Sequence, residues 1–245
     1  MFILNKLINR IFLLTAILSL TGCAADPNLP LYQGFWTDQP KPVVVVAMDT
    51  PSRADFDFNG AGLLDMAIIL AVNQKFITYL HQYDISSLDK LSTQLVQNLN
   101  QHGIIAKKYN EKINLSQLKN SSKTNFDAYE RKDFTPLASQ LKANRLLLIH
   151  VSFIGSYRGY YGLVPLGAPS AVCRIEGRLV NLKTNRTLWR FSTNQEIKVT
   201  APWSQPPSYP NFSNALNQAI DQANQTVLSN FFSSVPVLVT SQTKK

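Results

Sequence analysis

Two neighbouring stretches near the C-terminal end of the chain, 171–180 and 187–199, alternate between apolar and polar residues. This period of two is typical of strands with one packed face and one solvated face, and the short turn at 183–186 predicts an antiparallel hairpin. A hairpin of this kind needs a covering layer. The segment Phe212–Phe232 follows it and carries an apolar stripe at helical spacing. The apolar strand positions are Ala171, Cys173, Ile175 and Leu179 in the first stretch and Trp189, Phe191, Ile197 and Val199 in the second.

The remaining elements precede this hairpin. Helical segments separate three predicted strands, whereas the last two strands pair directly. This order predicts an α/β (α+β) fold: a mixed sheet of about five strands with a C-terminal antiparallel hairpin, flanked by three to four helices including a long C-terminal one. We expect one domain over 43–232 and a flexible tail over 233–245. The expected elements are a strand at Val43–Val46, an amphipathic helix at Ser86–His102, a strand at Ile104–Ala106, a helix opening at Thr135-Pro136 and a strand at Leu146–Ile154.

The N-terminal residues are typical of a targeting segment. Lys6 and Arg10 precede a short apolar run, and Leu20-Thr21-Gly22-Cys23 resembles the lipobox of bacterial lipoproteins. We therefore expect a signal peptide over 1–22 and a lipid on Cys23; an uncleaved anchor and an ordinary secretory peptide are the alternatives. Residue 24 is alanine, not the aspartate that resembles an inner-membrane retention signal. The resemblance therefore implies anchoring in the outer membrane, facing the periplasm.

Two further segments allow two interpretations each. Residues 23–42 form a lipidated, proline-rich tether, in which Tyr32, Phe35 and Trp36 are expected to dock either on the chain's own domain or on another subunit. The run Gly62–Val72 is apolar except for Asp65 and is too short to span a bilayer. A buried helix is the favoured interpretation, and membrane insertion on oligomerisation is the alternative.

The net charge of the chain limits the classes of binding partner that we expect. The net charge of +9 becomes +7 once Lys6 and Arg10 leave with the signal peptide, and only 16% of residues are charged. A basic exported protein faces anionic lipid headgroups, wall polymers or acidic proteins, and nucleic acid is not an expected partner.

With Cys23 acylated, Cys173 has no second cysteine in the chain with which to form a disulfide. A buried free thiol is the favoured interpretation, with an intermolecular bridge as the alternative.

Motifs of catalysis, metal binding or cofactor binding do not stand out in the sequence. The histidines His81, His102 and His150 are scattered, and His150 is expected to be a satisfied core residue. We therefore expect no enzyme, no metal and no cofactor.

A tyrosine–arginine cluster at 157–161 suggests a surface for protein partners, since tyrosine and arginine are enriched at interfaces. It lies in the predicted connection Gly155–Ser170, where the tyrosines could instead cover the hairpin. With Trp36, the expected partner-binding residues are Tyr157, Arg158, Tyr160 and Tyr161.

The order of elements resembles that of small periplasmic outer-membrane lipoproteins with an α/β domain of the TolB-N-terminal, penicillin-binding-protein-activator or curli-secretion type. The strand ending at Asn181–Phe191 carries the same local pattern. More loosely, the chain resembles accessory lipoproteins of type IV secretion outer-membrane complexes. These resemblances imply a structural or accessory subunit of a hetero-oligomeric envelope assembly. The alternatives are a wall-synthesis regulator or a glycan-binding protein that stacks sugars on Trp36, Trp203 and the tyrosine cluster; a hydrolase is less favoured.

Overall fold

The computed structural model describes residues 26–60, 62–200 and 202–236. The expected signal peptide, Cys23 with its expected lipid and the end of the tail lie outside these residues. Within them, the predicted α/β architecture is confirmed, with a seven-stranded mixed sheet where about five strands were expected. Five α-helices, α2–α6, belong to the described part of the chain.

The sheet has the strand order β3-β1-β4-β6-β7. β1 is parallel to both β3 and β4, whereas β6 is antiparallel to both of its neighbours, β4 and β7. The far half of β4 also pairs with two short strands, β2 and β5. The strands are β1 (Val43–Asp49), β2 (Asp55–Asn59), β3 (Ile105–Tyr109), β4 (Arg145–Tyr161), β5 (Val164–Pro165), β6 (Ser170–Asn181) and β7 (Arg186–Lys198).

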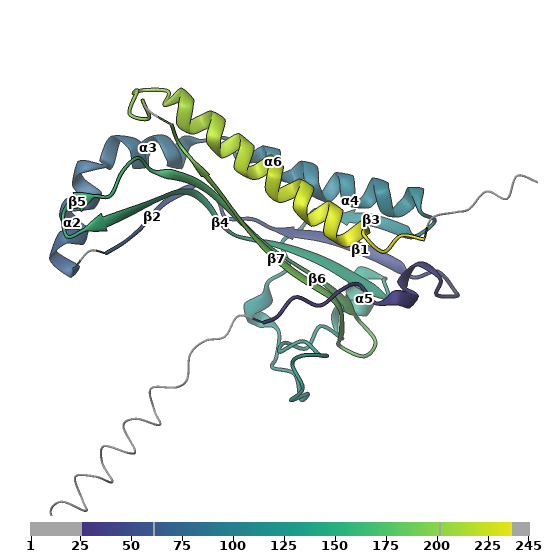
Figure 1. Cartoon of the computed structure of the whole chain (residues 1–245). Helices are drawn as coiled ribbons and strands as arrows, with labels where there is room; N and C mark the ends of the chain where they lie inside the picture. The colour runs from purple at the N-terminus through teal and green to yellow at the C-terminus, as the bar shows by residue number, and fades with distance from the viewer. Residues whose placement is uncertain (1–25, 61, 201, 237–245) are drawn as a thin grey trace, which may run out of the picture.

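The helices divide between the two faces of the sheet and one of its ends. The helices α4 and α6 lie over one face, α5 lies on the other, and α2 and α3 lie at the end where β2 and β5 pair (Figure 1). Three 3-10 turns complete the described elements: η1 (Gln33–Trp36), η2 (Ser86–Leu88) and η3 (Leu115–Gln117). The helices are α2 (Leu63–Val72), α3 (Gln74–Gln82), α4 (Asp89–Gln101), α5 (Leu137–Leu141) and α6 (Pro210–Phe232).

The two faces of the sheet bury separate cores. Val44 and Val46 belong to the larger core under α4 and α6, while Val45 belongs to the smaller core with α5. This explains the unbroken valine run, because a strand covered on both faces has no solvated side. At the centre of the larger core, the Trp189 indole donates a hydrogen bond of 2.9 Å to Asn230 Oδ1 on α6. It packs over Gly177, where a Cβ atom would lie 2.4 Å from its ring.

The N-terminal segment is part of this domain and not a spacer. Its backbone pairs with β7: Leu29 N and Arg190 O are 2.7 Å apart, and Tyr32 N and Leu188 O are 2.8 Å apart. Phe35 and Trp36 are buried in the larger core, so these two of the three aromatic residues dock on their own domain, whereas the Tyr32 side chain stays exposed. Residues 233–236 also belong to the domain, because Ser234 Oγ accepts a hydrogen bond from Trp36 Nε1 and Val235 packs against the core.

The predicted connection from Gly155 to Ser170 is wrong in its first half. Strand β4 continues through Tyr161, pairing with β2 on one side and β6 on the other. Gly155 makes this possible, because a Cβ atom there would lie 1.9 Å from the backbone oxygen of Asp55. Strand β2 and helix α3, neither of them predicted, both pack at this end of the molecule.

Candidate functional site

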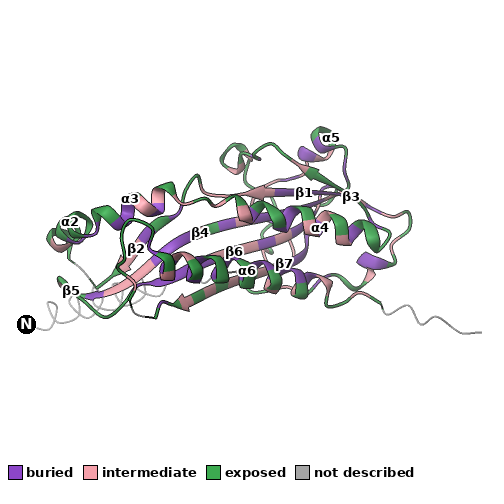
Figure 2. Ribbon diagram, turned by 90° about the horizontal axis from the view of Figure 1, so that it is seen from above, coloured by how far each residue is buried: buried purple, intermediate pink, exposed green. Residues whose placement is uncertain are grey.

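The described surface gathers its apolar side chains at one end of the molecule. Of the twelve large apolar residues that are exposed, ten lie on α2 or at the tip of the β4–β5 hairpin. Both views of the chain place α2 and β5 at this same end, and Figure 2 shows α2 as almost entirely exposed. We call this surface the apolar end: Leu63, Leu64, Met66, Ile68, Leu70, Val72, Tyr161, Leu163, Val164 and Leu166.

Helix α2 contradicts the favoured prediction of a buried helix. Ile69 is its only buried residue, whereas Leu63 and Leu64 are 90% and 80% exposed. A helix that is apolar on every side is normally a core helix or a membrane segment. Among the residues that the structure describes, no second layer covers it. The prediction of a short apolar helix in Gly62–Val72 is therefore confirmed, whereas the prediction that it is buried is wrong.

Hydrogen bonds hold α2 rigidly against the hairpin tip. The Asn73 side chain, buried between α2 and α3, donates from Nδ2 to Ile69 O at 2.7 Å and to Tyr160 Oη at 3.0 Å. Beyond them, Gly162 N donates to Gly60 O at 3.2 Å. A Cβ atom at Gly60 would lie 1.9 Å from the Tyr160 carbonyl oxygen, so the backbones touch at this point. The apolar end is therefore one preformed surface built from two segments far apart in the sequence.

The four residues of the predicted tyrosine–arginine cluster lie on β4, not in a loop. Tyr160 is buried and supports α2, so it is unavailable to a partner. Arg158 is half-buried: its Nε donates to Gly167 O at 2.7 Å, and its guanidinium lies 4.8 Å from the centre of the Trp203 ring. Tyr157 is half-buried as well. Tyr161 alone is strongly exposed, at 81%, and it belongs to the apolar end.

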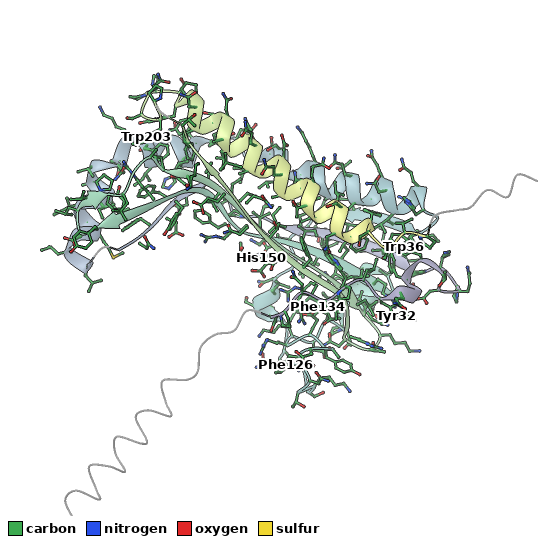
Figure 3. All side chains as sticks on the ribbon, in the orientation of Figure 1. Tyr32, Trp36, Phe126, Phe134, His150 and Trp203 are labelled. Carbon is green, nitrogen blue, oxygen red and sulfur yellow. The ribbon has the colours of Figure 1, made fainter. Side chains whose placement is uncertain are left out.

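The predicted stacking surface for a glycan does not form. Trp36 is 6% exposed and packs edge-on against Phe35, with ring centres 4.8 Å apart. Trp203 is covered by Arg158 and packs edge-on against Phe76. Figure 3 shows Trp36 and Trp203 at opposite ends of the molecule. The prediction that Trp36 binds a partner is therefore wrong, since its ring lies inside the core.

Polar groups that could carry chemistry are engaged in ion pairs. A depression of about 620 Å³ beside β2 contains Asp55 and Asp57, but Asp55 lies 3.2 Å from His81 and Asp57 lies 3.6 Å from Arg174. His150 lies half-exposed on the central strand β4 rather than in the core (Figure 3), with its Nδ1 2.9 Å from Asp49 Oδ2. No group of three His, Cys, Asp or Glu residues is placed to hold a metal ion in the ranges described above.

Cys173 and Glu130 carry two ionisable groups that are buried in the domain. Burial alone raises the pKa of the Cys173 thiol to about 12, as expected for a small residue packed on the apolar face of β6. The Glu130 carboxylate is buried but satisfied, accepting from Arg178 Nη1 at 3.0 Å and from Thr187 Oγ1 at 2.8 Å. Both groups stabilise the domain and neither faces the apolar end.

Membrane-crossing segments were also sought by length and hydropathy. Within the described residues, no single helix is long and apolar enough to cross a bilayer. Helices α2 and α3 satisfy the criteria only when taken together, and they are bent by 70° at their junction. Helix α3 buries Phe76, Ile77 and Leu80 in the domain, whereas α2 buries only Ile69.

Comparison with known proteins yields distant structural likenesses. No protein-family model and no curated protein matches the chain. A solved DUF330 protein from Xanthomonas campestris is 13% identical with a TM-score of 0.38, covering 86% of this chain and 88% of that one. A PelC dodecamer from Paraburkholderia phytofirmans is 10% identical (TM-score 0.36; 84% and 93%). Lipoprotein GNA1162 from Neisseria meningitidis is 12% identical (TM-score 0.27; 74% and 99%). At these scores, none of the likenesses assigns a function.

Proposed function

We propose that this chain is an outer-membrane-anchored periplasmic lipoprotein that acts as a structural or accessory subunit of a cell-envelope assembly, such as the outer-membrane complex of a secretion system. The lipobox ending at Cys23 supports the anchor. Two or more acyl chains on that residue would make its attachment to the membrane stable. The protein partners of the assembly are part of the proposal.

The observation that carries this proposal is the apolar end. Ten outward-facing apolar side chains stand on a helix and a hairpin that are fixed to each other, and contiguous exposed apolar surface of this kind marks an interaction site. The only ionisable side chains among residues 62–72 and 160–166 are Asp65 and the hydroxyls of Tyr160 and Tyr161. Such a surface suits binding rather than a reaction, so the proposal assigns the chain no enzymatic activity, metal or nucleic-acid partner.

The test is extraction of the native envelope in a mild detergent, followed by size analysis of the solubilised lipoprotein. We expect the chain to take up a palmitate label and to migrate in a complex much larger than the 27.5 kDa of the full 245-residue chain. The Cys23→Ser variant should lose the label and leave the complex. A labelled protein that migrates as a monomer and is retained on peptidoglycan would contradict the proposal and favour the glycan-binding alternative.

A further inference from the structure

We propose that the apolar end enters the acyl region of one bilayer leaflet, giving the domain a second membrane contact besides the lipid on Cys23. This inference rests on the proposed location at a membrane and names the occupant of the exposed surface. It requires a protruding apolar surface with its backbone polar groups satisfied, few charges, and a bilayer within reach.

The dimensions of α2 fit a single leaflet. Its ten residues form a helix about 15 Å long, which is half of the ~30 Å hydrocarbon core of a bilayer. Apart from Asp65 in its first turn, the helix is apolar around its circumference, and Ile69 is its only buried residue. A helix used only for protein docking needs a single apolar stripe on its outer side. Apolar side chains on all exposed sides match an environment that surrounds the helix.

Backbone hydrogen bonding at the apolar end also suits lipid. Helices and paired strands are the structures that satisfy their own polar groups in a medium without water. The hairpin tip beside α2 is closed by the bonds Leu166 N to Gly159 O, at 2.9 Å, and Gly162 N to Gly60 O, at 3.2 Å. The carboxylate of Asp65 accepts from Gly62 N at 3.2 Å at the helix N-terminus, where the helix dipole favours a negative charge. Charged side chains resume at Lys75 and Arg158, on the domain side of this surface.

The shape of the surface favours lipid over a second protein. Leu63, Leu64 and Tyr161 are 90%, 80% and 81% exposed, which means that they project from the domain with few neighbours of their own. Protein interfaces instead bury their anchors in closely packed pockets surrounded by a polar rim. A fluid leaflet adapts to a convex tip without a matching cavity. The bilayer is close, because Leu29 is fixed to β7 and Cys23 lies six residues earlier, a span of at most about 20 Å.

The test uses the full lipidated chain in phosphatidylethanolamine–phosphatidylglycerol vesicles, with an environment-sensitive fluorophore attached to a single introduced thiol. The chain is suited to this, since Cys23 is expected to be acylated and Cys173 is buried with a pKa of about 12. Leu64→Cys and Leu166→Cys probe the two elements of the apolar end separately. Ile105→Cys is the matched control, because Ile105 is an apolar residue, 58% exposed, on the edge strand β3.

We expect nitroxide groups on the lipid acyl chains to quench most of the fluorescence at positions 64 and 166 and little at position 105. Thermal unfolding should match the wild type, because both leucines are at least 70% exposed. Full quenching by aqueous iodide at both positions would overturn the inference, and so would shielding from iodide without lipid quenching, which would indicate a protein partner or a second copy. Neither result affects the proposed function, since the detergent-extracted complex is measured independently.

Discussion

Replacing Trp36 by alanine tests whether the N-terminal segment is a free spacer or a structural part of the domain. The side chain is 6% exposed, and its ring packs among Phe35, Phe231 and Phe232, with ring centres 4.8, 6.2 and 5.7 Å away. Its Nε1 also donates to Ser234 Oγ at 3.2 Å, which links the N-terminal segment to the end of the described chain.

The magnitude follows from the loss of a buried indole. Large-to-alanine changes at buried aromatic positions lower the free energy of unfolding by about 3–5 kcal/mol, because transfer energy is lost and a cavity remains. For a domain of this size, each kcal/mol lowers Tm by roughly 2–4 °C, which gives a decrease of about 6–20 °C. A residue in a free tether would change the free energy of unfolding by no more than ~0.5 kcal/mol.

Circular dichroism of the purified protein during heating measures this difference. Trp36→Phe should fall between the wild type and alanine, because it keeps one aromatic ring but loses part of the buried volume and the bond to Ser234. Tyr32→Ala is the neighbouring control, since the Tyr32 side chain is 44% exposed. If Trp36→Ala unfolds at the same temperature as Tyr32→Ala, the N-terminal segment does not contribute to the core as described.

Two further predictions concern buried polar groups. Tyr160→Phe removes the acceptor of the Asn73 amide, so we expect a loss of about 1 kcal/mol and faster tryptic cleavage at Lys75, whereas Tyr161→Phe, with an exposed hydroxyl, should match the wild type. The folded Cys173 thiol, with its pKa raised to about 12 by burial, keeps its proton above pH 9, where an unfolded thiol ionises. The contribution of this thiol to the free energy of unfolding is therefore fully present below pH 9 and declines above it by up to ~1.4 kcal/mol per pH unit. Denaturant unfolding of Cys173→Ala at increasing pH should show a shallower decline. An unchanged slope in that variant would argue against a buried neutral thiol.

Local patterns were sufficient for the elements that pack conventionally. The alternation around Cys173 and Trp189 predicted β6 and β7, and the apolar stripe of Phe212–Phe232 predicted α6 almost to the residue. Each of these elements buries one face against the same core, so periodicity and burial agree. The valine run of β1 was predicted for the same reason, as a strand covered on both sides.

The elements around the apolar end could not be read in this way. Gly155 and Gly159 were interpreted as signs of a loop, whereas Gly155 allows β2 to approach β4 closely. The Asp-Phe alternation over 55–58 was a signal for β2, and the spacing of Phe76, Ile77 and Leu80 was one for α3. The exposure of α2 had no local signal, because an all-apolar helix has the same sequence whether protein or another medium surrounds it.

If Cys23 carries a lipid and the apolar end enters a leaflet, as we propose, the pairing of Leu29 with Arg190 restricts how the domain is oriented on that membrane. Through the registers of β7, β6 and β4, Arg190 aligns with Leu148, which lies thirteen residues from Tyr161 along β4. At ~3.3 Å per residue, the anchored segment and the apolar end are therefore about 40 Å apart along the strands. The segment between Cys23 and Leu29 spans at most about 20 Å, so under this proposal both ends could contact the same membrane only if the long axis lay within roughly 30° of the membrane plane. Such a domain would recline along the inner surface of the membrane instead of standing upright in the periplasm, and its partners would meet it from above.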